Sequence, residues 1–261
     1  MPCITDILQQ FEPITLQEME SVKLMNRIDT KYVVPMTVLP RLLQMAQANY
    51  YIQQINSKRT GDYDTVYYDT EDLDMYIRHH DRQLVRQKIR VREYVDSNLF
   101  FLEVKRKSNR GRTKKKRISI PCFALTPDLI GQGKEPIRVD DFLAAKSWYR
   151  FEQISPRLRT AFTRITLVNK AKTERLTIDY RLQFTNLRSG EQTTIPNMVI
   201  VELKRDGHVP SPMLDIMLTL RIKQLKISKY CIGTALTNHE VKQNRFKAKI
   251  RKINKIVSSN K

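Results

Sequence analysis

The stretch from Leu84 to Ile120, LVRQKIRVREYVDSNLFFLEVKRKSNRGRTKKKRISI, predicts three consecutive antiparallel strands and decides the fold. Short turns, Asp-Ser-Asn and Ser-Asn-Arg-Gly, separate the strands. Because alternate residues of a strand share a face, Leu84–Tyr94 carries a row of cations on one face and mostly β-branched residues on the other. The cations of this row are Arg86, Lys88, Arg90 and Arg92.

The following strands repeat the pattern. Lys105 and Lys107 share one face of the second strand with Glu103. In the third strand both faces are cationic, because Lys114 and Lys116 alternate with Lys115 and Arg117. Two later segments again show one charged face. Residues 174–182 carry Arg175 on it, and residues 198–204 carry Glu202 and Lys204.

Several strands with the same polarity indicate one shared charged surface. A solvated basic face on an ordinary sheet is the simplest alternative. A closed barrel, however, would gather all these faces in one lumen and leave no sheet edge exposed. We therefore predict an α+β fold, a closed antiparallel β-barrel (tunnel) of about eight strands with helices packed outside. Inward cations cannot stay unpaired, so the expected occupant is a polyanion.

Composition supports an anionic partner. Against 27 acidic residues the 261-residue chain carries 47 lysines and arginines, a formal net charge of +20. Its three cysteines are widely spaced, which predicts neither a disulfide framework nor a zinc site and favours a cytoplasmic location. The sequence shows no signal peptide and no transmembrane segment.

Three regions are expected along the chain. Residues 1–25 would form an N-terminal helical cap, 26–237 the barrel, and 238–261 a basic, helical C-terminal tail. The tail places apolar residues among many cations, which is typical of an amphipathic helix lying on the barrel, on a membrane surface or on a partner; a solvated helix is the alternative. Another helix starts near Ser228, where Lys229 opposes the helix dipole and therefore suggests a functional role.

Six motifs, in order between Asn26 and Thr237, resemble the catalytic domain of the vacuolar transporter chaperone (VTC) family of polyphosphate polymerases, within the triphosphate tunnel metalloenzyme (CYTH-like) superfamily. In this sequence they read R-x-D-x-K-Y (27–32), Y-Y-D-T (67–70) with Tyr76, I-R-V-R-E-Y (89–94), L-E-V-K-R-K (102–107), V-E-L-K (201–204) and S-K-Y (228–230). The resemblance implies a tunnel that binds ATP and inorganic polyphosphate with a divalent metal, Mn²⁺ as the expected ion and Mg²⁺ as the alternative.

The resemblance also implies roles for residues. Glu202 would be the metal ligand. Catalysis would depend on Lys31, Arg90, Arg92 and Lys229. The predicted phosphate-binding positions, which include further cations of the charged faces, are Arg27, Lys88, Lys105, Lys107, Lys116, Arg164, Arg175 and Lys204.

One departure from the superfamily bears on the reaction. Where its hydrolases carry E-x-E-x-K near the N-terminus, this chain has Arg27-x-Asp29-x-Lys31, with a cation replacing one acid. This favours a polymerase, which transfers the terminal phosphoryl group of ATP to a growing polyphosphate chain, over a triphosphatase.

Two alternatives stay open. One is a metal-dependent tripolyphosphatase or nucleoside triphosphatase of the same fold, and the other is a non-enzymatic RNA- or polyphosphate-binding module. Against a nucleic-acid partner, the tyrosines do not interleave with the basic positions as stacking platforms. The sequence leaves open the chain length, the oligomeric state and whether a membrane-protein partner receives the product.

Overall fold

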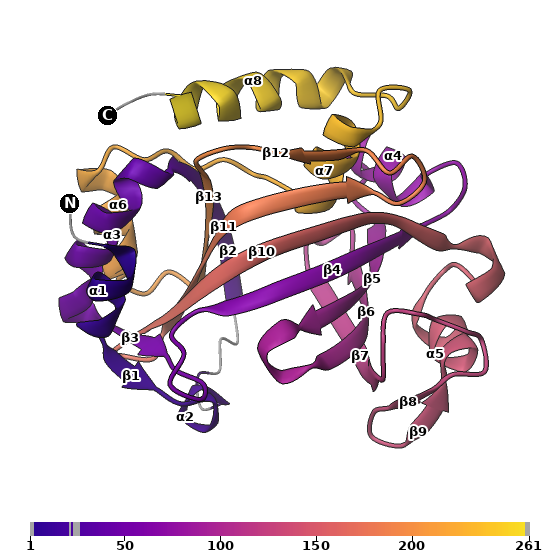
Figure 1. Cartoon of the computed structure of the whole chain (residues 1–261), viewed down its shortest axis with the longest axis horizontal. Helices are drawn as coiled ribbons and strands as arrows, with labels where there is room; N and C mark the ends of the chain where they lie inside the picture. The colour runs from indigo at the N-terminus through magenta and orange to yellow at the C-terminus, as the bar shows by residue number, and fades with distance from the viewer. Residues whose placement is uncertain (1–2, 21, 23–26, 259–261) are drawn as a thin grey trace.

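The computed structural model describes residues 3–20, 22 and 27–258, and within them most strands join one large sheet. Figure 1 shows this sheet with helices around it. The strands are β1 (Glu12–Ile14), β2 (Arg27–Pro35), β3 (Tyr50–Gln53), β4 (Gly61–Asp69), β5 (Arg86–Tyr94), β6 (Leu99–Lys107), β7 (Thr113–Ile120), β8 (Ile130–Gln132), β9 (Pro136–Arg138), β10 (Ser155–Asn169), β11 (Glu174–Asn186), β12 (Gln192–Thr194) and β13 (Met198–Asp206). The α-helices are α1 (Ile4–Gln9), α2 (Leu16–Glu20), α3 (Leu39–Ala46), α4 (Asp74–His80), α5 (Val139–Lys146), α6 (Pro212–Thr219), α7 (Lys229–Thr237) and α8 (Asn244–Ser258).

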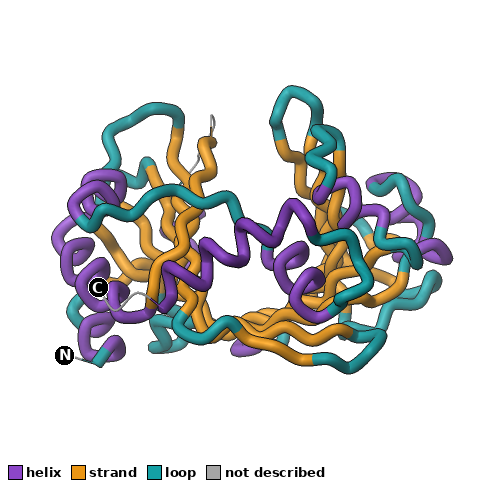
Figure 2. Tube along the Cα trace, turned by 90° about the horizontal axis from the view of Figure 1, so that it is seen from above, coloured by secondary structure: helices purple, strands orange, loops and turns teal. Residues whose placement is uncertain are grey.

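The main path of the sheet runs β2-β13-β11-β10-β4-β5-β6-β7-β8-β9, with antiparallel neighbours throughout. The α+β class and the large antiparallel sheet are therefore confirmed. Closure is not, because in the described part of the chain no strand pair joins β2 to the β7–β9 end. The sheet instead bends until its two ends face each other (Figure 2).

The two ends of the sheet differ in how their outer edges are used. Pro121 directly follows β7 and has no N–H to extend a ladder, and β7 pairs with β8 only at Ser119 and Gln132. At the other end, β2 uses its outer edge differently, since the Leu225 N–H donates to the Lys31 carbonyl at 2.8 Å. The barrel is thus replaced by a curved, open sheet.

The segment Gln224–Ser228 connects the two sides of the bent sheet. It begins beside β2, where Gln224 bridges to Tyr32. It ends beside β5, where Lys88 Nζ donates to Ser228 Oγ at 2.7 Å. Ser228 also caps α7 by accepting from the Cys231 N–H at 3.2 Å. This irregular segment therefore bridges the gap between the two sides of the sheet, which a pair of hydrogen-bonded strands would close in a complete barrel.

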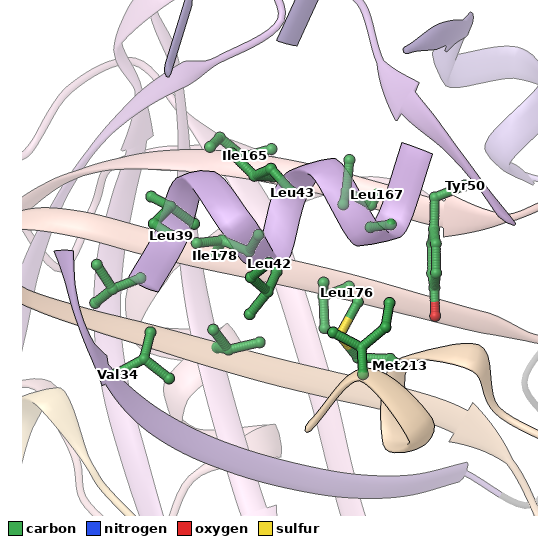
Figure 3. Close-up of a cluster of buried hydrophobic side chains, with 14 of the residues drawn as sticks. Val34, Leu39, Leu42, Leu43, Tyr50, Ile165, Leu167, Leu176, Ile178 and Met213 are labelled. Carbon is green, nitrogen blue, oxygen red and sulfur yellow. The ribbon is translucent and has the colours of Figure 1, made fainter. Parts of the chain in front are cut away.

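The convex face of β2, β13, β11 and β10 is covered by helices (Figure 3). In α3 the buried residues recur at helical spacing, namely Leu39, Leu42, Leu43 and Ala46, and they pack with Ile165 and Ile178 of the sheet. The N-terminal segment joins this layer: α1 contributes Ile7 and Leu8. It is not purely helical as predicted, because β1 pairs in parallel with β3. The predicted boundary at residues 25 and 26 lies outside the described residues.

The C-terminal tail forms α8, which lies above β12 and α7 in Figure 1 and contacts α7 and β2. Its apolar side is covered by the protein itself, since Phe246 and Ile253 are buried in one cluster with Tyr230 and Tyr76. At its start, the Arg245 N–H donates to His80 Nε2 at 3.3 Å. The sequence left open whether this helix lies on the barrel, on a membrane surface or on a partner, and in the structure it packs on the folded domain. No helix in the described residues combines the length and apolar character needed to cross a membrane.

A prediction concerns Gly233, in the middle of α7. A Cβ at this position would lie 2.5 Å from Phe184 Cδ1 and 2.7 Å from Leu158 Cδ2. We expect Gly233→Ala to lower the free energy of unfolding by about 1–3 kcal/mol, because overpacking outweighs the ~1 kcal/mol that alanine gains in helix propensity. Urea unfolding measures the change, and a stabilised variant would contradict the tight packing of α7 on the sheet.

Candidate functional site

The concave side of the bent sheet carries nearly all the predicted site residues. Cross-strand register places them on one face: Lys31 lies opposite Glu202, Arg175 opposite Lys204, and Arg164 opposite Asp179. On the other wall, Arg90 lies opposite Glu103 and Lys88 opposite Lys105. We call this surface the charged face. Its cations are Lys31, Lys88, Arg90, Arg92, Lys105, Lys115, Arg117, Arg164, Arg175, Lys204 and Lys229.

Three carboxylates organise the charged face, and each one binds two cations. Glu202 pairs with Lys31 and with Lys204, the latter at 2.9 Å. The other two carboxylates are almost completely buried, with side chains only 2% and 4% exposed. Their pairs are Glu103 with Arg90 and Lys115, and Asp179 with Arg164 and Lys229.

The arginines in these bridges are held in fixed orientations. Arg164 donates from Nε and Nη2 to the two oxygens of Asp179, at 2.6 and 2.9 Å. Arg90 donates to Glu103 from Nε at 2.7 Å. Such two-point contacts fix the plane of a guanidinium group. The remaining N–H groups of each arginine are therefore presented in a defined direction.

Lys229 is positioned by two of the sequence motifs acting together. Its neighbour Tyr230 donates from its hydroxyl to Asp69 Oδ2 at 2.5 Å. The same carboxylate accepts the N–H groups of Met75 and Tyr76, both at 2.9 Å, and so caps the start of α4. The acid of Y-Y-D-T and the tyrosine of S-K-Y thus meet, and this contact directs Lys229 onto the charged face.

Five cations of the charged face have no salt bridge to a carboxylate among the described residues: Lys88, Arg92, Lys105, Arg117 and Arg175. The side chain of Arg92 is buried, donates to Thr65 Oγ1 at 3.2 Å and lies 5.5 Å from the centre of the Tyr63 ring. Burial and the neighbouring Arg90 and Arg164 lower the pKa of Arg92. A buried cation without a counterion is unfavourable unless an anion binds beside it.

Three lysines of the charged face have lowered pKa values. Lys105 stays accessible to solvent, yet desolvation between the walls lowers its pKa to about 8, with Lys31 of the opposite wall contributing and Glu202 opposing. Burial lowers the pKa of Lys204 to about 8 and that of Lys229 to about 7, although each pairs with a carboxylate. Unshielded positive charge therefore accumulates on this face.

Three further predicted phosphate-binding residues lie away from the centre of this face. Arg27 and Lys107 lie on the same side of the sheet, at the start of β2 and the end of β6, and the Arg27 Nε donates to Asp29 at 2.6 Å. Lys116 is a correction: it lies opposite Val104 and so points to the other side of the sheet. Lys115 lies on the charged face instead, donating from Nζ to Glu103 Oε1 at 2.7 Å.

The sequence analysis did not assign Lys115, Glu103 or Asp179 to the site. For Lys115 the sequence held no signal, because every residue from Lys114 to Arg117 is a cation and alternation cannot select a face. For the two acids a signal existed. Glu103 shares a face with Lys105, and Asp179 shares one with Arg175, which indicates inward carboxylates.

The fit of a divalent metal depends on the available donors. Among the described residues no group of three or more acidic, histidine or cysteine side chains could hold a metal ion. Glu202 offers a carboxylate on the charged face with its side chain 16% exposed, and Asp29, paired with Arg27, lies on the same side of the sheet with its side chain 29% exposed. Mg²⁺ and Mn²⁺ are commonly bound by one or two carboxylates completed by substrate phosphates. The donor set therefore fits a phosphate-completed site at Glu202 and does not fit an all-protein metal cage.

A cavity of about 420 Å³ lies at the opposite end of α7 and is separate from the charged face. Its lining mixes acids and cations, including Glu71, Arg157 and Arg188, and contains none of the predicted site residues. The polyanion chemistry is therefore assigned to the charged face.

Fold and site together define a class of protein, an α+β domain whose curved antiparallel sheet gathers surplus cations on its concave side. Within that class, the sequence profile of the VTC domain matches residues 26–238, and the chain belongs to this family. No curated protein shows significant similarity to the chain.

Solved structures show more distant similarity. A Bacillus halodurans protein assigned provisionally as an adenylate cyclase is 16% identical, with a TM-score of 0.48 over 85% of this chain and 100% of its own. A Vibrio parahaemolyticus protein with the same provisional assignment is 10% identical, with a TM-score of 0.46 over 81% and 99% of the two chains. An adenylyl cyclase candidate from Hippeastrum with a dominant triphosphatase activity is 13% identical, with a TM-score of 0.43 over 81% and 96%.

A prediction follows from the lowered lysine pKa values. A bound phosphate chain favours protonated lysines, so binding of tripolyphosphate near pH 8 should take up protons, chiefly on Lys105, Lys204 and Lys229. Calorimetry in buffers of different ionisation enthalpy measures this uptake.

The control is Lys105→Arg, which keeps the charge but cannot lose its proton in this range. The variant should take up fewer protons than the wild type at the same pH. Binding without any proton uptake would show that the lysines are already fully charged before the ligand arrives.

Proposed function

We propose that the protein is an ATP-dependent polyphosphate polymerase, which transfers the terminal phosphoryl group of ATP to the end of an inorganic polyphosphate chain. The observation that carries the proposal is the set of unpaired cations on the charged face, above all buried Arg92 beside Arg90 and Arg164. Membership of the VTC domain family supports phosphate chains as the ligand. Residues on both walls can contact one extended chain of phosphates.

The reaction needs alignment more than acid–base chemistry. The terminal oxygen of the chain, already anionic, forms a bond to the γ-phosphorus of ATP while the bond from that phosphorus to the β,γ-bridging oxygen breaks, and ADP leaves with the electron pair. No general base is required. A loose phosphoryl-transfer transition state is stabilised by in-line positioning and by charge on its equatorial oxygens.

The residues divide into two groups for this task. Arg90 and Arg164, held by Glu103 and Asp179, present fixed N–H groups that orient phosphate oxygens. Arg92, Lys88 and Lys105, without carboxylate partners, bind phosphates directly and neutralise the developing charge.

Other lysines and the metal complete the site. Lys31 and Lys229 lie on the charged face as further point charges. Glu202, together with substrate phosphate oxygens, would hold the divalent metal, with Mn²⁺ as the first ion to test. When bound, the metal supplies Lewis-acid polarisation and neutralisation of phosphate charge.

The direct test is to incubate the purified protein with ATP and Mn²⁺ and to analyse products on a gel stained for polyphosphate. We expect a ladder of chains and one ADP for each phosphate incorporated. Hydrolysis would yield ADP and orthophosphate without chains. That result would replace the polymerase proposal with a triphosphatase of the same fold, and binding without turnover would leave a polyphosphate-binding module.

A second prediction addresses Glu202. We expect Glu202→Gln to reduce metal-dependent turnover by about a hundredfold, since the amide keeps the shape but loses the charge that holds a cation. Metal-free binding of tripolyphosphate should be retained or tightened, because Lys31 and Lys204 lose their carboxylate partner.

These two readouts separate the metal from the phosphate site. Turnover near the wild-type level in saturating Mn²⁺ would remove Glu202 from the metal site. A parallel loss of metal-free tripolyphosphate binding would instead show that Glu202 mainly maintains the structure of the charged face.

A further inference from the structure

A second group of cations lies beyond the charged face, where α8 crosses the fold. Arg86 and Lys107 face each other at the ends of β5 and β6. Lys226 belongs to the segment that connects the two sides of the sheet, and Lys249 belongs to α8. We call these four residues the α8 cluster.

Contacts of neighbouring residues bring the segments that carry the α8 cluster together. Lys88, two residues from Arg86 on the same strand face, donates to Ser228 Oγ, two residues from Lys226. This contact places Arg86 close to Lys226. The helix α8 is fixed above them, because Phe246 packs 5.3 Å from the His80 ring and 5.6 Å from the Tyr76 ring.

The orientation of α8 turns Lys249 inward. Phe246 and Ile253, three residues before and four residues after Lys249, are both buried, so Lys249 lies on or next to the covered side of the helix. It is half-buried, and its Nζ lies 5.7 Å from the centre of the Phe246 ring. Lys247 and Lys255 of the same helix are exposed to solvent.

The α8 cluster lacks compensating negative charge. None of its four residues forms a salt bridge within residues 3–20, 22 and 27–258. Burial lowers the pKa of Lys107, with Arg86 and Lys226 adding to the effect, and burial lowers that of Lys249, with Lys226 contributing.

A half-buried histidine lies within the same positive potential. Burial, together with the surrounding cations Lys88, Arg86, Lys249 and Lys107, lowers the pKa of His79 to about 2. His79 Nδ1 is buried and has no hydrogen-bond partner. Positive charge therefore converges here from the sheet, the connecting segment and α8.

We infer that the α8 cluster is a second phosphate subsite, which holds the part of an inorganic polyphosphate chain that extends beyond the reacting end. The inference rests on the proposed function and adds a preference for long chains. Lys88 belongs to the charged face and lies next to Arg86, so the two sites form one continuous row of cations. A chain bound at both sites would gain affinity through linked contacts.

Two other polyanions fit this position less well. A membrane would meet α8 only through its cations, because its apolar residues are already packed against α4 and α7. Duplex nucleic acid binds broad, exposed basic surfaces, whereas Lys249 is half-buried beneath the helix that carries it. An extended, unbranched phosphate chain is narrow enough to pass along the row.

The test compares two double variants with the same loss of charge. Lys226→Gln/Lys249→Gln removes two members of the α8 cluster, and Lys247→Gln/Lys255→Gln removes two exposed lysines of α8. Metal-free affinities for tripolyphosphate and for polyphosphate of about one hundred units are measured at about 0.15 M salt, where exposed charges are screened.

We expect the first variant to lose about tenfold in affinity for the long chain and less than about twofold for tripolyphosphate. The control variant should lose less than about twofold for either ligand. Equal losses of long-chain affinity in the two variants would show that the effect comes from net charge alone, and this would overturn the subsite. Unchanged long-chain affinity in the first variant, or a wild type with no preference for long chains, would overturn the subsite.

The outcomes also separate this inference from the proposed function. A protein that binds tripolyphosphate and makes polyphosphate but shows no long-chain preference would retain its activity and lose the subsite. A protein that prefers long chains through Lys226 and Lys249 but makes none from ATP would retain the subsite as part of a polyphosphate-binding module. Melting curves of all variants establish that each is folded.

Discussion

Electrostatic repulsion among cations on one concave face is the constraint on which this structure depends. Eleven cations lie on the charged face, and three carboxylates neutralise only part of that charge. Buried ion pairs contribute little net stability once desolvation is counted, but removing one partner is costly. Glu103, Asp179 and Glu202 therefore allow the sheet to fold without a ligand. The positive charge that they leave unpaired favours the binding of an anionic ligand.

Packing of α7 links the hydrophobic core to the charged face. α7 packs its buried residues against the sheet, and Tyr230 binds Asp69, the acid that also caps α4. The backbone position of Lys229 is therefore set by the packing of α7. Paired cations such as Arg164 are fixed, whereas Arg92 and Lys105 remain available. Preorganised groups that need no rearrangement are the ones that lower a reaction barrier most effectively.

Most residues of the charged face could be predicted from the sequence. Alternate residues of a strand share a face, so cations that alternate with apolar residues are expected to point away from the core. The prediction failed where that contrast is missing: from Lys114 to Arg117 only the pairing with β6 places Lys115, and not Lys116, on the charged face. The open barrel also could not be predicted, because pairing between the first and last strands, and the contact of Leu225 with the β2 edge, depend on tertiary structure. The α8 cluster was missed for the same reason, since its members are far apart in the chain.

An open sheet has exposed edges, and exposed edges invite pairing with other chains. Here the edge of β7 carries Lys114, Lys115 and Lys116, whose charge opposes such pairing, while β2 is partly covered by Gln224 and Leu225. The cations that would attract a phosphate chain therefore also protect the sheet while it is empty. A closed ladder would fix the distance between the walls, whereas among the described residues the Gln224–Ser228 segment and α8 connect them across the open side. A ligand that contacts both walls would add a third connection, so binding and closure of the fold are expected to be coupled.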